Sequence, residues 1–93
     1  MTKIIFSRTA QKQLIDHARF IYEQSLSPEI ADAYLDRMYQ YIVDILTRFP
    51  RSGRVSNEII ENSRKLVYQG FSIIYCIEVT HIEILLIYRE NLP

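Results

Sequence analysis

The sequence predicts an α+β fold in which a helical hairpin covers one face of a four-stranded antiparallel sheet, with the element order β-α-α-β-β-β. Two observations lead to this prediction. Apolar residues recur at helical spacing through most of the first half of the chain, and they alternate at strand spacing in its last third. The chain has 93 residues, which is room for one hydrophobic core, so residues 1–93 are expected to form a single domain.

The first half begins with a short β-rich run, residues 3–6, and continues as an amphipathic helix of about residues 8–24. Ser7 is a good N-cap for this helix, because its hydroxyl can accept a hydrogen bond from an amide of the first turn. The apolar stripe of the helix consists of Ala10, Leu14, Ala18, Ile21 and Tyr22.

A second helix is predicted after a short break. Ser27 caps it, and Pro28 takes the first helical position, where its missing N–H is not needed. The helix should end at Phe49, because Pro50 follows. Its stripe consists of Ala31, Leu35, Met38, Ile42, Ile45 and Phe49. A connection this short makes the two helices antiparallel.

The remaining elements are expected to be strands. A mostly irregular segment comes first, residues 50–63, and three strands follow, at about residues 64–68, 71–79 and 82–88. Gln69-Gly70 suits a two-residue hairpin turn, since Gly readily adopts a positive φ. The helical hairpin returns the chain to the end of the sheet that it left. The next strand should therefore run opposite to the first, and the whole sheet should be antiparallel.

Alternation assigns the side chains of the last two strands to two faces of the sheet. Those expected to meet the helices are Phe71, Ile73, Tyr75, Ile77, Val79, Ile82, Ile84, Leu86 and Tyr88. Those expected on the outer face are Ser72, Ile74, Cys76, Glu78, Glu83, Leu85, Ile87 and Arg89. Ile74, Leu85 and Ile87 would then form an apolar patch rimmed by charges, which makes them candidate partner-binding residues.

Composition argues against several classes of protein. Lys plus Arg equals Asp plus Glu at 11 each, so the basic excess typical of nucleic-acid binders is missing. No apolar run reaches membrane-spanning length, and the first residues do not resemble a signal peptide, so we expect a soluble, cytoplasmic protein. Two separated histidines and the single Cys76 make a metal site improbable, and no cofactor is expected.

Three stretches of the chain carry motifs of a known family, in the family's order. FSRTAQKQLIDHARFIYEQ has a strand and a Ser-x-x-Ala helix start, and LTRFPRSGR has a Leu-x-x-x-Pro-x-x-Gly hinge. SRKLVYQGFSIIYCIEVTHIEILLIYREN has an Arg, a Gly-aromatic pair, Tyr-x-Ile and Ile-x-Ile-Leu. This series, which covers nearly the whole chain, resembles the ParE branch of the ParE/RelE toxins of bacterial type II toxin–antitoxin systems.

The resemblance implies a growth-inhibiting toxin that a cognate antitoxin, ParD-like or another short protein, holds inactive. ParE-like members poison DNA gyrase, whereas RelE-like members share the fold and cut messenger RNA on the ribosome. The fold therefore does not choose between the two activities. A third reading is a decayed member that binds antitoxin but is no longer toxic.

Cleavage of RNA without a metal needs a base, an acid and cations for the phosphate. The residues that could supply them here are Arg64, Lys65, Tyr68, Tyr75, Tyr88 and Arg89. Many RelE-like enzymes have an Arg where this chain has Ser72, and many members of both branches have a His where it has Tyr88. These departures and the zero net charge favour a gyrase poison without chemistry of its own.

A structural reading competes with the functional one for most of these residues. Tyr68 and Tyr75 suit the core or edge of a sheet, and Arg64 and Lys65 could serve to protect a sheet edge from aggregation. For antitoxin binding, the second helix offers three tyrosines that lie around its stripe, Tyr34, Tyr39 and Tyr41. Arg64 and Lys65 are further candidates, as contacts for an acidic antitoxin tail.

Overall fold

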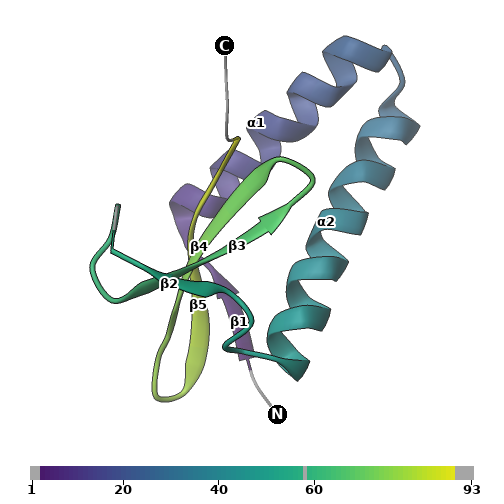
Figure 1. Ribbon diagram of the computed structural model, residues 1–93. Helices are drawn as coiled ribbons and strands as arrows, with labels where there is room; N and C mark the ends of the chain where they lie inside the picture. The colour runs from purple at the N-terminus through teal and green to yellow at the C-terminus, as the bar shows by residue number, and fades with distance from the viewer. Residues whose placement is uncertain (1–2, 58, 90–93) are drawn as a thin grey trace.

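The computed structural model describes residues 3–57 and 59–89. Its strands are β1 (Lys3–Phe6), β2 (Arg54–Ser56), β3 (Ser63–Tyr68), β4 (Phe71–Ile77) and β5 (His81–Arg89), and its helices are α1 (Arg8–Ser25) and α2 (Pro28–Arg48). Both helices pack on one face of a single sheet, as Figure 1 shows. The predicted α+β fold, a helical hairpin on one face of a sheet, is confirmed.

Both helices begin at the predicted caps. The hydroxyl of Ser7 accepts a hydrogen bond from the amide of Ala10 at 3.0 Å, and that of Ser27 accepts one from the amide of Ile30 at 3.3 Å. Pro28 occupies the first turn of α2, and Phe49 is the residue that ends it. Local capping chemistry thus sets both helix starts.

The predicted sheet is wrong in two respects. Five strands lie in the order β1-β5-β4-β3-β2, and β1 pairs with β5 in parallel, from Lys3 opposite His81 to Phe6 opposite Ile84. The reason is β2, which lies inside the segment that was expected to be irregular. The chain does run opposite to β1 when it leaves α2, but β2 takes up that direction and pairs antiparallel with β3. The chain reverses between β2 and β3, so β3 runs parallel to β1. It reverses again before β4 and before β5, so β5 is also parallel to β1.

The β3–β4 hairpin has the predicted two-residue turn. Tyr68 pairs with Phe71, and the two residues between them have positive φ, 47° at Gln69 and 86° at Gly70. Positive φ at both central positions matches the right-handed twist of the flanking strands.

A β-bulge in β5 reverses the predicted faces of its second half. Tyr75 pairs with Ile84 but Ile74 pairs with Leu86, so Leu85 is the extra residue. Beyond it Ile87 pairs with Ile73 and lies fully buried in the core beneath the helices. The assignment of Ile87 to the outer face is therefore wrong, as is that of Leu86 and Tyr88 to the inner face.

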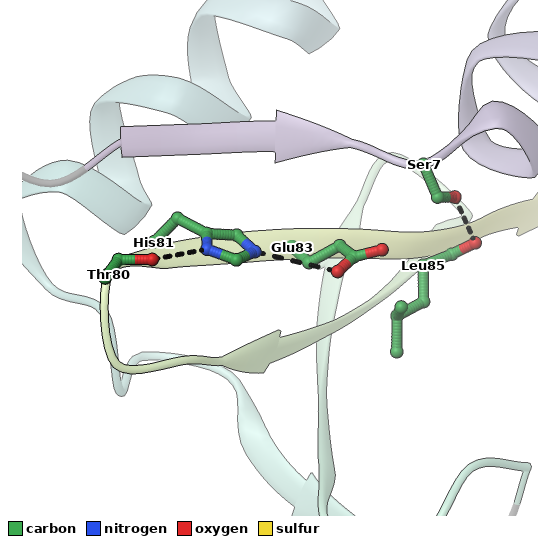
Figure 2. Close-up of polar contacts among 5 residues, drawn as sticks. All are labelled: Ser7, Thr80, His81, Glu83 and Leu85. Carbon is green, nitrogen blue, oxygen red and sulfur yellow. Dashed lines mark hydrogen bonds and ion pairs between the residues drawn. The ribbon is translucent and has the colours of Figure 1, made fainter.

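The N-cap Ser7 and two side chains of α1 close the edge of β5 that β1 leaves open after Phe6. The hydroxyl of Ser7 donates to the carbonyl of Leu85 at 3.0 Å, as Figure 2 shows. The amide of Ile87 donates to Oε1 of Gln13 at 2.6 Å, and its carbonyl accepts from Nε2 of His17 at 3.1 Å. One helix thus supplies the hydrogen bonds that a neighbouring strand would otherwise make.

The core lies between the sheet and the two helices. Its buried members are Ala10, Leu14, Met38, Ile42, Leu46, Leu66, Phe71, Ile73, Tyr75, Ile82, Ile84 and Ile87. Two residues expected to face the helices are exposed instead, Ile77 at the end of β4 and Val79 in the following turn. The strand stops before Val79, so alternation no longer places that side chain.

Candidate partner-binding site

Tyr75 and Arg64, cross-strand neighbours on β4 and β3, hold the loop that follows α2 against the sheet. The buried hydroxyl of Tyr75 donates to the carbonyl of Pro50 at 2.7 Å and accepts from the amide of Gly53 at 2.9 Å. Nη1 of Arg64 donates to the carbonyl of Gly53 at 2.7 Å and to that of Arg51 at 3.2 Å. Both candidate catalytic groups thus bind the protein's own backbone.

Burial raises the pKa of Tyr75 above its ordinary value of 10.0, although the Gly53 amide and Arg64 act in the opposite direction. Burial also raises the pKa of Tyr34, with help from nearby Tyr68. Ionisation of these two phenols is therefore less favourable in the folded protein than in the unfolded chain.

Stability should consequently fall at alkaline pH. A raised folded pKa contributes stability that is fully present below the unfolded value of 10.0 and is lost as the pH rises through the folded pKa. Urea unfolding between about pH 9 and pH 11 should show this loss, and Tyr75→Phe should make it smaller. Tyr22→Phe, at an exposed tyrosine, controls for the removal of one hydroxyl. An unchanged alkaline loss in Tyr75→Phe would contradict the prediction.

The residues that could cleave RNA do not converge. Strand pairing places Arg64, Tyr68 and Tyr75 on the helix-facing side of the sheet, whereas Lys65 and Tyr88 lie on the opposite side. Arg89 also lies on the helix-facing side, where its guanidinium stacks over the ring of Phe20 on α1, 4.8 Å from the ring centroid. The sheet itself therefore separates Lys65 and Tyr88 from the other four groups.

An open groove lies between α2 and β3. Its volume is about 550 Å³, and its lining consists of Asp36, Arg37, Gln40, Tyr41, Asp44 and Tyr68. The rings of Tyr41 and Tyr68 touch across its floor, with centroids 4.7 Å apart and planes at 35°. We call this the Tyr41–Tyr68 groove. It has an aromatic floor and charged walls, a combination suited to an amphipathic segment.

An unpaired strand edge borders the same groove. Within the described residues β2 pairs only with Ser63, Arg64 and Lys65, whereas β3 continues to Tyr68. The outer edge of residues 66–68 has no strand beside it in this part of the chain. Val67, at the middle of the free edge, is exposed. An extended peptide could add here as a further strand.

Only some of the predicted partner-binding residues lie at this groove. Tyr41 lines it, and Tyr34 packs edge-on against Phe71, with ring centroids 6.0 Å apart. Tyr39 points elsewhere and stacks on Phe6 at 5.2 Å. Of the sheet residues, Ile87 is core, Ile74 is only 2% exposed and Leu85 is half-buried. The predicted apolar outer patch of Ile74, Leu85 and Ile87 therefore does not exist as an open surface. Lys65 is likewise only 9% exposed.

The groove residues that sequence reasoning missed are polar. Asp36, Arg37, Gln40 and Asp44 recur at spacings of one, three and four along α2. The helical period alone would have put Asp36, Gln40 and Asp44 on one side of α2 together with Arg37. A polar helix side is more often simply solvated, and only the position of β3 shows that it forms the wall of a groove.

A Thr80–His81–Glu83 cluster at the β4–β5 turn superficially resembles a catalytic triad. Nδ1 of His81 lies 3.1 Å from the Thr80 hydroxyl, and its Nε2 lies 3.6 Å from the Glu83 carboxylate (Figure 2). The second contact is too long for a hydrogen bond, and Thr80 is fixed in an exposed turn. We therefore regard the cluster as a consequence of the shape of the turn and not as a catalytic site.

The described residues contain no group of three or more metal-ligating side chains. Burial and the neighbouring Glu78 raise the pKa of the Cys76 thiol, which keeps it protonated and weakly nucleophilic. In the same part of the chain, neither helix is long and apolar enough to cross a membrane.

Comparison with known proteins identifies the family. Residues 4–91 match the sequence model described as the ParE toxin of the type II toxin–antitoxin system, parDE. The chain belongs to the ParE toxin family. The predicted resemblance to this branch is confirmed, and the comparison with curated proteins found no match.

Solved structures share the fold of this ParE-family chain. The chromosomal ParDE system from P. aeruginosa matches with a TM-score of 0.78 and 22% identity over 96% of each chain. The toxin–antitoxin complex RelBE2 from Mycobacterium tuberculosis matches with a TM-score of 0.66 and 20% identity over 96% of this chain and 98% of that one. A conserved hypothetical protein from Helicobacter pylori matches at 0.54 and 10% over 98% and 97%.

Proposed function

We propose that this ParE-family toxin acts by poisoning DNA gyrase, and that a cognate antitoxin neutralises it by occupying the Tyr41–Tyr68 groove. The observation that carries the first part is the placement of the cations and tyrosines that RNA cleavage would require. Transfer of a phosphoryl group needs its base, acid and cation within reach of one phosphate. Here the sheet separates Lys65 and Tyr88 from the other four groups, and those four already make contacts within the protein.

The contacts of the individual groups support the same reading. Tyr75 is fully buried and binds the backbone of residues 50–53, and Arg64 donates hydrogen bonds to two carbonyl groups of the same loop. A guanidinium that donates hydrogen bonds to two backbone carbonyls serves mainly to hold that backbone in place. A protein that inhibits by binding alone needs no such constellation, which favours the gyrase poison over the messenger RNA nuclease.

The antitoxin proposal rests on the geometry of the groove. A segment that pairs with the free edge of residues 66–68 would direct alternate side chains toward the aromatic floor. Asp36 on the opposite wall would favour a basic residue in the segment, and Arg37 an acidic one, whereas Asp44 already pairs with Arg48 at 2.6 Å. The similar structures that are named as toxin–antitoxin assemblies support a partner of this kind.

Expression of the chain alone should arrest growth, and co-expression of its antitoxin should restore it. Normal growth at verified expression would leave only a decayed member that still binds antitoxin.

Purified protein should inhibit supercoiling by gyrase or trap cleaved DNA, and it should leave messages intact in a translating extract. Arg89→Ala and Tyr88→Phe are the informative variants in the extract, because Arg64→Ala would also release the loop after α2. Message cleavage that either variant abolishes would replace the gyrase proposal by ribosome-dependent nuclease activity.

Antitoxin binding should depend on one tyrosine of α2 and not on its neighbour. Tyr41→Ala is expected to weaken the affinity for antitoxin by about 2 kcal/mol or more, roughly 30-fold, because it removes half of the aromatic floor. Tyr39→Ala is the matched control, since Tyr39 lies on the same helix but packs on β1. Calorimetric titration of both variants, with circular dichroism to verify folding, makes the comparison. Equal losses would place the antitoxin elsewhere.

A further inference from the structure

A second groove lies on the other side of the helical hairpin, between α1 and α2. Its volume is about 320 Å³. α1 contributes Ile15 and Tyr22, and α2 contributes Pro28 and Ala31. Ile15 is 59% exposed, and Tyr22 is also exposed. This surface, which we call the hairpin groove, is apolar although it is not part of the core.

The tip of the hairpin extends the apolar surface at a cost in backbone conformation. Leu26 ends α1 with φ 55° and ψ 27°, a left-handed conformation that favours glycine. Its side chain is 77% exposed. Ile30, on the first turn of α2, is exposed as well but does not line the groove. In Figure 1 the tip stands clear of the strands. A leucine that is both strained and exposed indicates a contact that the isolated chain does not make.

Two opposite charges line the same groove without neutralising each other. Arg19 lies on α1 and Asp32 on α2, and among the described residues neither has an ion-pair or hydrogen-bond partner. Both lie near the tip, Arg19 in the second half of α1 and Asp32 in the first turns of α2. The groove is therefore apolar along its length and carries one cation and one anion on opposite walls.

We propose that the hairpin groove binds a second copy of this chain. A two-fold axis along the groove would place α1 of each copy over α2 of the other at the same height along the helices. Arg19 of one copy would then face Asp32 of the other, twice in the dimer. Tyr22 would cover Ala31 of the partner, which lies at a similar distance from the tip of the hairpin. The net charge of zero means that two copies do not repel each other at long range.

This inference is independent of the proposed function. The hairpin groove and the Tyr41–Tyr68 groove share no lining residue, and the first is built with α1 whereas the second is built with β3. A dimer of this kind therefore leaves both antitoxin grooves open. It also removes from water the apolar side chains of Ile15 and Tyr22, which line the groove and which the free chain exposes.

Sedimentation equilibrium of the purified full chain over a range of concentrations tests the proposal. The wild-type protein should reach the mass of a dimer. Arg19→Glu and Asp32→Arg should each weaken the dimer at least about tenfold, because each places like charges opposite one another. The double variant should restore the wild-type dissociation constant. Val79→Ala, at an exposed apolar residue of the β4–β5 turn, is the matched control and should change nothing.

Leu26→Gly tests whether the side chain of Leu26 contributes to the dimer or to the stability of the fold. It should raise the thermal midpoint, measured at a dilution where the protein is monomeric, because glycine suits the left-handed conformation. It should also weaken the dimer. A lower midpoint would mean that Leu26 serves the fold and would remove one of the observations behind the proposal.

Two results would overturn the proposal. One is a monomer at every concentration, and the other is a dimer that Arg19→Glu and Asp32→Arg leave unchanged. Hydrogen exchange with antitoxin present identifies the occupant in the first case. Protection of Ile15 and Tyr22 by antitoxin in a monomeric toxin would assign the hairpin groove to the antitoxin instead.

Discussion

Gly53→Ala should lower the free energy of unfolding by about 3 kcal/mol, a large part of the 5–15 kcal/mol typical of a small domain. A Cβ at this position would lie 2.7 Å from Cε1 and 2.8 Å from the hydroxyl of Tyr75, and 2.9 Å from the carbonyl of Lys65. The Tyr75 ring is fully buried and the carbonyl belongs to β3, so neither can yield easily. The loop would have to leave the sheet and lose its hydrogen bonds to Tyr75. Urea unfolding monitored by circular dichroism measures the change.

Gly70→Ala is the matched control for the effect of removing a glycine. Gly70 has φ +86°, but a Cβ there would meet open space, so the substitution should cost only about 1 kcal/mol of backbone strain. Gly53→Ala combined with Tyr75→Phe should cost less than the sum of the two single changes, because both act on one contact. Equal effects at the two glycines would show that the close approach to Tyr75 is unimportant.

Ile87→Ala should cost about 3 kcal/mol of unfolding free energy, whereas Leu86→Ala should cost about 1 kcal/mol. Ile87 is fully buried against Ile73 beneath the helices, so truncation leaves a cavity in the core. Leu86 lies on the other face and is half-buried, so water can refill much of the space. Denaturant unfolding of the two variants compares neighbouring residues that are both large and aliphatic.

The comparison tests the bulge directly. Strict alternation along β5 would make Leu86 the core residue and Ile87 the outer one, and the costs would then be reversed. An amide-exchange measurement at Ile87 adds a check, since Oε1 of Gln13 accepts the hydrogen bond of its amide in the wild-type protein. Gln13→Ala should speed that exchange without changing which face Ile87 occupies.

Much of the fold follows from local patterns. The caps at Ser7 and Ser27 and the turn at Gln69-Gly70 depend on neighbouring residues only, and all three were predicted. β2 was missed because a strand of three residues carries almost no periodic signal. Missing it was enough to make β3 seem opposite to β1, and so to predict an antiparallel sheet.

The candidate site was less predictable than the fold. The sequence identified Tyr41 and Tyr68 as notable aromatics, but their contact joins two elements that are far apart in the chain. The polar wall of Asp36, Gln40 and Asp44 becomes part of a groove only because β3 lies opposite to it. Conversely, Arg64 and Tyr75 were two of the six candidates for RNA cleavage, and the structure shows that they hold the loop after α2.

The sequence by itself determined the helices and their caps, the hairpin turn and membership of the ParE family, because each depends on short-range chemistry or on an ordered series of motifs. The predicted stripes were right only in part, since Tyr22 and Phe49 are exposed. Tertiary structure alone decided the parallel pairing of β1 with β5 and the side of the sheet on which each residue of β5 after Ile84 lies. The physical reason is that one extra residue in a strand reverses every later side chain, and alternation cannot show where that residue is. Here the extra residue is Leu85, whose carbonyl accepts a hydrogen bond from the hydroxyl of Ser7, 78 residues away in sequence.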